Sequence, residues 1–72
     1  MKRTAVDKVL FLLDDKYTNI GQIAEDIGLH SSAGFRWRRE CGGQIPTRDW
    51  NDIIALAKKH KVKLQKTDLI ND

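Results

Sequence analysis

Apolar residues near the N-terminus recur at the spacing of an amphipathic helix. Val6, Val9, Leu10 and Leu13 fall at positions i, i+3, i+4 and i+7, which puts them on one face of an α-helix. Thr4 precedes this run and can act as its N-cap. The first segment is therefore predicted to be a helix that buries one apolar stripe.

Two further apolar residues, Phe11 and Leu12, fall partly off this stripe. They either widen the buried face of the helix or form an exposed apolar patch for a second chain. The sequence leaves both alternatives open.

The next two segments are predicted to be short helices joined at a glycine. One begins with Asn19 as N-cap and Gln22 three residues later, which is a capping-box pattern, and it stops at Gly28. The other begins at His30 or Ser31, with serines available to cap it, and ends in the sequence CGGQIP. The buried stripe of the first of these helices is predicted to consist of Ile20, Ile23, Ala24 and Ile27.

A fourth helix is predicted after Pro46. Thr47 is its expected N-cap, and lysines and a histidine lie at its end, as the helix dipole favours. Its apolar stripe is predicted to consist of Trp50, Ile53, Ile54 and Ala57.

The tail has a different pattern. Val62 and Leu64 alternate with lysines, which is compatible with a short strand over residues 62–65, and Leu69 and Ile70 are expected to fold back on the core. A chain of 72 residues without internal repeats or a long linker forms one domain with a small core. The predicted fold is all-α with four to five helices, and the short C-terminal strand is its one optional addition.

Four residues of the second and third segments have the spacing of a helix-turn-helix. Ala24 is followed after four residues by Gly28, then by apolar Leu29, and Trp37 comes nine residues after the glycine. A small residue at position 24 lets the helices approach, the glycine allows a sharp turn, and Leu29 and Trp37 fill the wedge between them. A helix-turn-helix is predicted over residues 19–41, although a generic helical hairpin can show the same spacing.

Residues 19–37 resemble the helix-turn-helix of the Cro-like and related small phage and prophage repressors. The sequence that follows, IPTRDWNDIIALAKKH and then VKLQKTDLI, resembles a subgroup whose signature is Ile-Pro-x-Arg-x-Trp. The resemblance covers residues 19–70. It implies a Cro/repressor-like domain and a sequence-specific DNA-binding regulator, usually dimeric.

Gly34 departs from the pattern of that family, which prefers a branched apolar residue such as valine here. It lies in the middle of the third helix, where glycine costs roughly 1 kcal/mol relative to alanine. With Trp37 as the buried anchor, Gly34 falls on the inward face. We expect it to permit close contact between the third helix and the rest of the core, with remaining space filled by Trp37 or Trp50.

The outward face of the third helix suits the major groove of DNA, which admits one helix and presents a distinct donor and acceptor pattern for each base pair. Arg36 is the first candidate for a bidentate contact with guanine. Phe35 either packs on a thymine methyl group or turns into the core, and His30 is either a turn residue or a DNA contact. The candidate base-reading residues are Ser31, Ser32, Phe35, Arg36 and Arg39.

Other polar residues near this face are candidates for contact with DNA phosphates. Asn19 and Gln22 can donate hydrogen bonds from the start of the second helix, and Arg38 lies to the side of the base-reading face. Arg48, the arginine of the signature, either contacts phosphate or pairs with Asp52 four residues later. The candidate phosphate-binding residues are Asn19, Gln22, His30, Arg38 and Arg48.

Basic residues are concentrated in the second half of the chain. Residues 1–35 hold four Lys and Arg against five Asp and Glu, whereas residues 36–66 hold nine against three. This asymmetry, within a net charge of +3, suits a polyanionic partner. A merely solvated basic face is the alternative.

Several other classes of site are not indicated by the sequence. Cys41 is the only cysteine, which excludes an internal disulfide, and with the two histidines far from it there is no zinc-ligand cluster. There is no glycine-rich phosphate loop, no nucleophile with a base and no pair of carboxylates typical of an enzyme. Neither a long apolar run nor a cleavable signal is present. We expect no cofactor, no metal, no small-molecule substrate and no membrane partner, and a place in the bacterial cytoplasm with the nucleoid.

The sequence and its resemblance predict a transcriptional repressor of phage or prophage origin that binds a palindromic operator in double-stranded DNA as a homodimer and controls its own operon. One alternative is a protein-interaction module, such as an antitoxin or adaptor, which a continuous apolar patch of Phe11, Leu12 and Phe35 would favour. The other is an architectural protein that binds all duplexes through phosphates. Residues 62–65 and the Phe11/Leu12 pair are equal candidates for the dimer surface.

Overall fold

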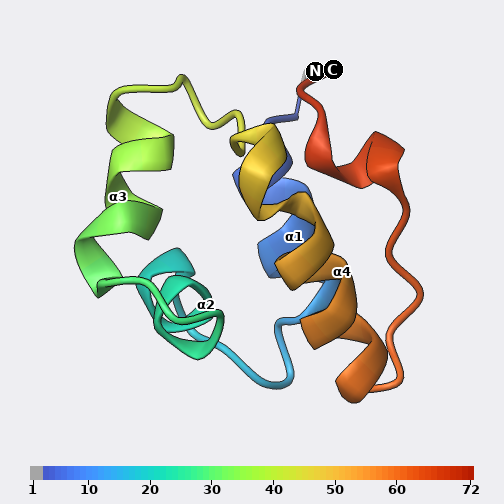
Figure 1. Cartoon of the computed structure of the whole chain (residues 1–72). Coiled ribbons are helices and arrows are strands. Elements are labelled where there is room, and N and C mark those ends of the chain that lie inside the picture. Colours follow the sequence, from blue (N-terminus) through green and yellow to red (C-terminus); the bar gives the residue numbers. More distant parts are fainter. Residues whose placement is uncertain (1–2) are drawn as a thin grey trace.

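The computed structural model describes residues 3–72, which fold into α-helices joined by short connections (Figure 1). No strand forms within these residues, so the predicted all-α class is confirmed and the optional strand over residues 62–65 is wrong. A strand needs a neighbouring strand to bond its backbone, and this segment has none. The helices are α1 (Ala5–Leu12), α2 (Ile20–Asp26), α3 (Ser31–Arg39) and α4 (Trp50–Lys59), with 3₁₀ turns η1 (Thr47–Asp49) and η2 (Lys66–Leu69).

Two of the predicted caps begin the first two helices. The hydroxyl of Thr4 accepts a hydrogen bond from the backbone N–H of Asp7 at 3.2 Å. In the same way, Oδ1 of Asn19 accepts from the backbone N–H of Gln22 at 3.0 Å. Each bond satisfies a backbone donor that has no partner inside its helix, and both predictions are confirmed.

The prediction that Thr47 caps the fourth helix is wrong. Residues Thr47–Asp49 form η1 without a side-chain cap, and α4 begins at Trp50. The backbone N–H of Asp49 donates to the carbonyl of Pro46 at 3.0 Å, so the chain after the proline winds into a tighter turn before the α-helix starts.

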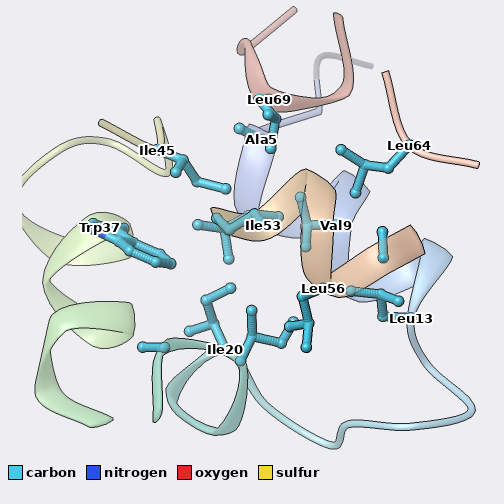
Figure 2. Packing of buried hydrophobic residues seen from close by; sticks show 14 of the residues in the cluster. Ala5, Val9, Leu13, Ile20, Trp37, Ile45, Ile53, Leu56, Leu64 and Leu69 are labelled. Atoms are coloured by element: carbon cyan, nitrogen blue, oxygen red, sulfur yellow. The ribbon is translucent and has the colours of Figure 1, made fainter. Parts of the chain in front are cut away.

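One hydrophobic core draws side chains from all four α-helices and from the loop that follows α3. Figure 2 shows Trp37 reaching from α3 toward Ile53 of α4, with Ile45 of the loop beside them. At the edge of the core, the indole N–H of Trp50 donates to the carbonyl of Ile45 at 2.7 Å. The predicted stripe residues that are buried are Val6, Val9, Leu13, Ile20, Ile23, Ala24, Ile53 and Ala57, whereas Leu10, Ile27, Trp50 and Ile54 are only partly buried.

The C-terminal segment folds back on α1. Leu69 is fully buried as predicted, but the prediction for Ile70 is wrong, because the chain becomes extended there and turns that side chain into solvent. The ammonium of Lys8 donates to the carbonyl of Ile70 at 2.8 Å and pairs with the carboxylate of Asp72 at 2.6 Å. The hydrogen bond from Lys8 holds the pKa of the Asp72 carboxyl below its usual range. The backbone N–H of Asp72 also donates to the carbonyl of Arg3, so the first and last of the described residues lie side by side (Figure 1).

Leu12 widens the buried face of α1, whereas Phe11 is exposed, so each of the two alternatives holds for one of these residues. Leu12 is partly buried and packs against the core, whereas Phe11 is 66% exposed. The guanidinium of Arg3 lies 5.1 Å from the centre of the Phe11 ring, a cation–π contact at the surface. None of the helices within residues 3–72 is both long and apolar enough to cross a lipid bilayer.

Tyr17, Asp26 and His60 form a hydrogen-bonded cluster that joins the loop after α1 to the C-terminal ends of α2 and α4. The Tyr17 hydroxyl donates to Oδ2 of Asp26 at 2.6 Å and lies 3.1 Å from Nε2 of His60. Because the single hydroxyl hydrogen is directed to Asp26, the Nε2–H of His60 donates to the Tyr17 oxygen. Burial of the ring, with the hydrogen bond to Asp26, raises the pKa of Tyr17 to about 12.

Replacing Tyr17 with phenylalanine is expected to reduce the alkaline destabilisation of the protein. The unfolded chain loses the tyrosine proton near pH 10, whereas the folded protein keeps it up to about pH 12. The stabilisation is therefore complete below pH 10 and is lost as the pH rises from 10 to about 12. The reason is that the unfolded chain gives up the tyrosine proton at a lower pH than the folded protein does. Over this pH range, the unfolding free energy of the wild type should fall by about 2 kcal/mol more than that of Tyr17→Phe.

Urea denaturation of both proteins at about pH 8.5 and about pH 12 measures this difference. At the lower pH, Tyr17→Phe should be about 1 kcal/mol less stable, because the bond to Asp26 is missing. At the higher pH that gap should close or reverse. A gap of equal size at both pH values would contradict the assignment.

Candidate nucleic-acid interface

The turn between α2 and α3 is built by the residues of the predicted spacing. Gly28 has a φ of 91°, a conformation that side chains rarely adopt. The backbone N–H of Leu29 donates to the carbonyl of Ala24 at 2.9 Å, which closes the end of α2. Ala24 and Trp37 are buried and Leu29 packs against the core, so these residues hold α2 and α3 together.

At Gly34, α3 lies directly on the first turn of α2. A Cβ atom on Gly34 would stand 2.5 Å from the carbonyl oxygen of Ile20 and 2.9 Å from the backbone nitrogen of Gly21. Atoms of a close-packed interior do not approach so closely, so any side chain here would force the helices apart. The expected close contact at Gly34 is confirmed, and its partner is the backbone of α2 rather than a tryptophan.

Gly21 makes a second close contact, which the sequence pattern did not identify. A Cβ atom there would stand 2.8 Å from Cε2 of Phe35, so the Phe35 ring rests against the start of α2. The ring is 44% exposed and therefore lies at the surface instead of in the core. The one sequence signal for this contact was the position of Gly21, two residues after the N-cap Asn19, because glycine lowers the stability of a helix there.

The exposed face of α3 carries four of the five candidate base-reading residues. The side chains of Arg36 and Arg39 form no hydrogen bond or ion pair with any residue from 3 to 72. Ser31 is different, because it is half-buried at the first position of the helix. A surface hollow of about 360 Å³ on this face is lined by Ser32, Phe35, Arg36, Arg39 and Glu40.

His30, and not a serine, is the N-cap of α3. Its Nδ1 accepts a hydrogen bond from the backbone N–H of Ser32 at 3.1 Å and lies 3.0 Å from the Ser32 hydroxyl. Because Nδ1 accepts, the neutral ring carries its hydrogen on Nε2, which is free to donate elsewhere. His30 is thus a turn residue that also presents an outward donor.

The two amide side chains at the start of α2 are held by their oxygen atoms. Oδ1 of Asn19 accepts from Gln22, and Oε1 of Gln22 accepts from the backbone N–H of Thr18 at 2.7 Å. Both residues are exposed. Their NH₂ groups are donors that these caps do not use, and they are the groups suited to phosphate oxygens.

Arg38 lies to the side of the exposed face and contacts α1. Its Nη1 pairs with Oδ1 of Asp7 at 3.3 Å, and both side chains are about half exposed. Such an exposed ion pair contributes at most about 1 kcal/mol to the free energy of unfolding. Arg38 therefore joins α3 to α1 while staying accessible to a phosphate.

Of the two alternatives for Arg48, the pair with Asp52 is wrong within residues 3–72, and the contact with phosphate stays a prediction. The carboxylate next to it is that of Asp49, with Oδ2 at 3.7 Å from the Arg48 Nε, and no ion pair joins Arg48 to Asp52 within residues 3–72. Asp49 is buried, and its Oδ2 has no hydrogen-bond partner among the described residues. The Arg48 side chain is exposed, so its guanidinium remains available to a phosphate.

A second hollow, of about 190 Å³, separates α3 from the segment before α4. Arg36, Glu40 and Cys41 line it from the α3 side, and Pro46 and Arg48 from the other. Arg48 thus borders the Arg36 side of the exposed face. On the opposite side, Asn19 Oδ1 and the Phe35 ring both approach Gly21, so Asn19 borders the Phe35 side.

Within residues 3–72, no group of three or more His, Cys, Asp or Glu side chains is placed to hold a metal ion, and Cys41 is free and exposed. Comparison of the chain with protein-family models, with curated proteins and with solved structures gave no match.

Proposed function

We propose that this protein is a sequence-specific DNA-binding regulator in which α2 and α3 act as a helix-turn-helix and α3 enters the major groove. The observation that carries the proposal is the exposed face of α3, where two arginines lack partners within residues 3–72. Base reading needs donors that are not already used inside the protein. The contact of Gly34 with the backbone of α2 supports the proposal further, because it fixes the helix that carries these donors.

Donors for phosphates flank this face on both sides. Arg48 lies next to the face on the side of Arg36, and Asn19 lies next to it on the side of Phe35. A helix in the major groove has a sugar-phosphate strand on either side, and contacts with both strands fix its orientation. Gln22, Arg38 and the Nε2–H of His30 are further candidate phosphate contacts.

The domain is too small to span two half-sites of an operator. Its longest dimension is 27 Å, whereas half-sites read on one face of DNA are about 34 Å apart. One protomer therefore reads one half-site, and a twofold-symmetric homodimer matches a palindromic operator. Together with the resemblance to phage and prophage repressors, this leads us to propose a cytoplasmic repressor that covers the promoter of its own operon.

Selection from a randomised duplex library, followed by fluorescence anisotropy, tests the function. The selected duplex should be palindromic and should bind about 100-fold or more tightly than a shuffled duplex. With about four to six phosphate contacts per protomer, the logarithm of the dimer's affinity should fall against the logarithm of salt concentration with a slope of about −7 to −11.

The other outcomes identify the alternative functions. Equal, salt-sensitive binding to all duplexes would indicate an architectural protein, and absence of binding would indicate a protein-interaction module. The contiguous patch that would favour such a module is not formed, because Phe11 and Leu12 line a hollow with the C-terminal segment, whereas Phe35 lines the hollow on α3.

A further inference from the structure

Glu40 is the only acidic residue between His30 and Arg48. It directly follows α3, and its backbone N–H still donates to the carbonyl of Arg36 at 2.7 Å, so it continues the helical course. Glu40 and Arg36 together line the hollow on the exposed face and the second hollow beside it. A single carboxylate thus lies beside Arg36 and Arg39 on the exposed face of α3.

Local stability does not explain this carboxylate. The side chain is exposed and forms no hydrogen bond or ion pair with any other described residue. It lies at the C-terminal end of a helix, where the dipole disfavours negative charge. Next to DNA, it also repels phosphates and lowers the affinity for every duplex.

We propose that Glu40 is a specificity-determining residue that accepts a hydrogen bond from the exocyclic amino group of a cytosine. A carboxylate in the major groove accepts from cytosine N4 and is repelled by the acceptor oxygens of guanine and thymine. Glu40 lies four residues beyond Arg36, a rise of about 6 Å, so the cytosine lies within about two base pairs of the guanine that Arg36 reads. The inference rests on the proposed function.

The test is Glu40→Gln, which keeps the size of the side chain and removes its charge. Selection from a randomised duplex library should give the same site as the wild type, except that the preference for cytosine near the guanine position falls about tenfold. Affinity for a shuffled duplex should rise about threefold or more, because a repulsive charge is removed. Loss of specificity together with a gain in non-specific affinity is a combination that a structural defect does not produce.

Asp52→Asn is the matched control, because it makes the same charge change on α4, where Asp52 lines a hollow with α2. It should leave every base preference unchanged. Identical base preferences in wild type and Glu40→Gln would overturn the role of Glu40 while leaving the proposed function intact. A wild type that selects no site at all would overturn both.

Discussion

Gly34→Ala is expected to destabilise the fold by about 2 kcal/mol, although alanine is the better helix former. The gain in helix propensity is roughly 1 kcal/mol. The added Cβ would stand 2.5 Å from the carbonyl oxygen of Ile20, and this atom belongs to the backbone of α2 and cannot rotate away. Relief therefore requires a shift of one helix against the other, an overpacking cost that outweighs the gain.

Gly21→Ala is the matched control, because the nearest atoms to its added Cβ belong to two exposed side chains, the ring of Phe35 and Oδ1 of Asn19. The ring can rotate, so the unfolding free energy should change by less than about 1 kcal/mol. Urea denaturation of the wild type and both variants measures these values. For a domain of this size, a loss of about 2 kcal/mol is a large fraction of the total stability.

The two variants should also differ in their affinity for DNA. Gly34→Ala should weaken specific binding, because α3 moves relative to α2 and its side chains no longer meet the bases and phosphates together. Gly21→Ala should affect only the contacts made by Phe35 and Asn19, the two side chains that the added Cβ meets. A Gly34→Ala protein that is more stable than the wild type and binds DNA equally well would contradict any need for close packing at this position.

Most features of the fold that depend on neighbours in the sequence could be predicted, although the Thr47 cap was an exception. The caps at Thr4 and Asn19 and the turn at Gly28 each follow from a few adjacent residues, and the structure confirms them. The apolar stripes were predictable for the same reason, since helical periodicity sets which side chains share a face. Close packing at Gly34 followed from its place on the same face as Trp37.

Features that depend on contacts between distant segments could not be predicted. The pair of Arg38 with Asp7 joins residues far apart in the sequence, and the contact of Phe35 with Gly21 depends on how α3 crosses α2. The His30 cap was missed for another reason. Histidine is an uncommon N-cap, and the serines beside it were the residues that capping preferences favour.

Arg36→Ala is expected to weaken binding to the selected duplex by about 100-fold or more while weakening binding to a shuffled duplex far less. A bidentate contact with guanine discriminates by about 1–3 kcal/mol, and a dimer makes it twice. Arg36 is exposed and unpaired among the described residues, so its removal should leave the unfolding free energy within about 0.5 kcal/mol of the wild type. Anisotropy and urea denaturation measure the two effects.

Arg36→Lys tests whether geometry or charge is responsible. Lysine keeps the positive charge but lacks the planar fork that meets both guanine acceptors. It should therefore retain binding to the shuffled duplex and still lose most of the preference for the selected one. Lys59→Ala removes a charge on α4, in the hollow shared with Asp52, and should leave that preference unchanged. If Arg36→Ala and Lys59→Ala weakened both duplexes equally, the arginine would be one more phosphate contact, and α3 would not be the helix that reads the sequence.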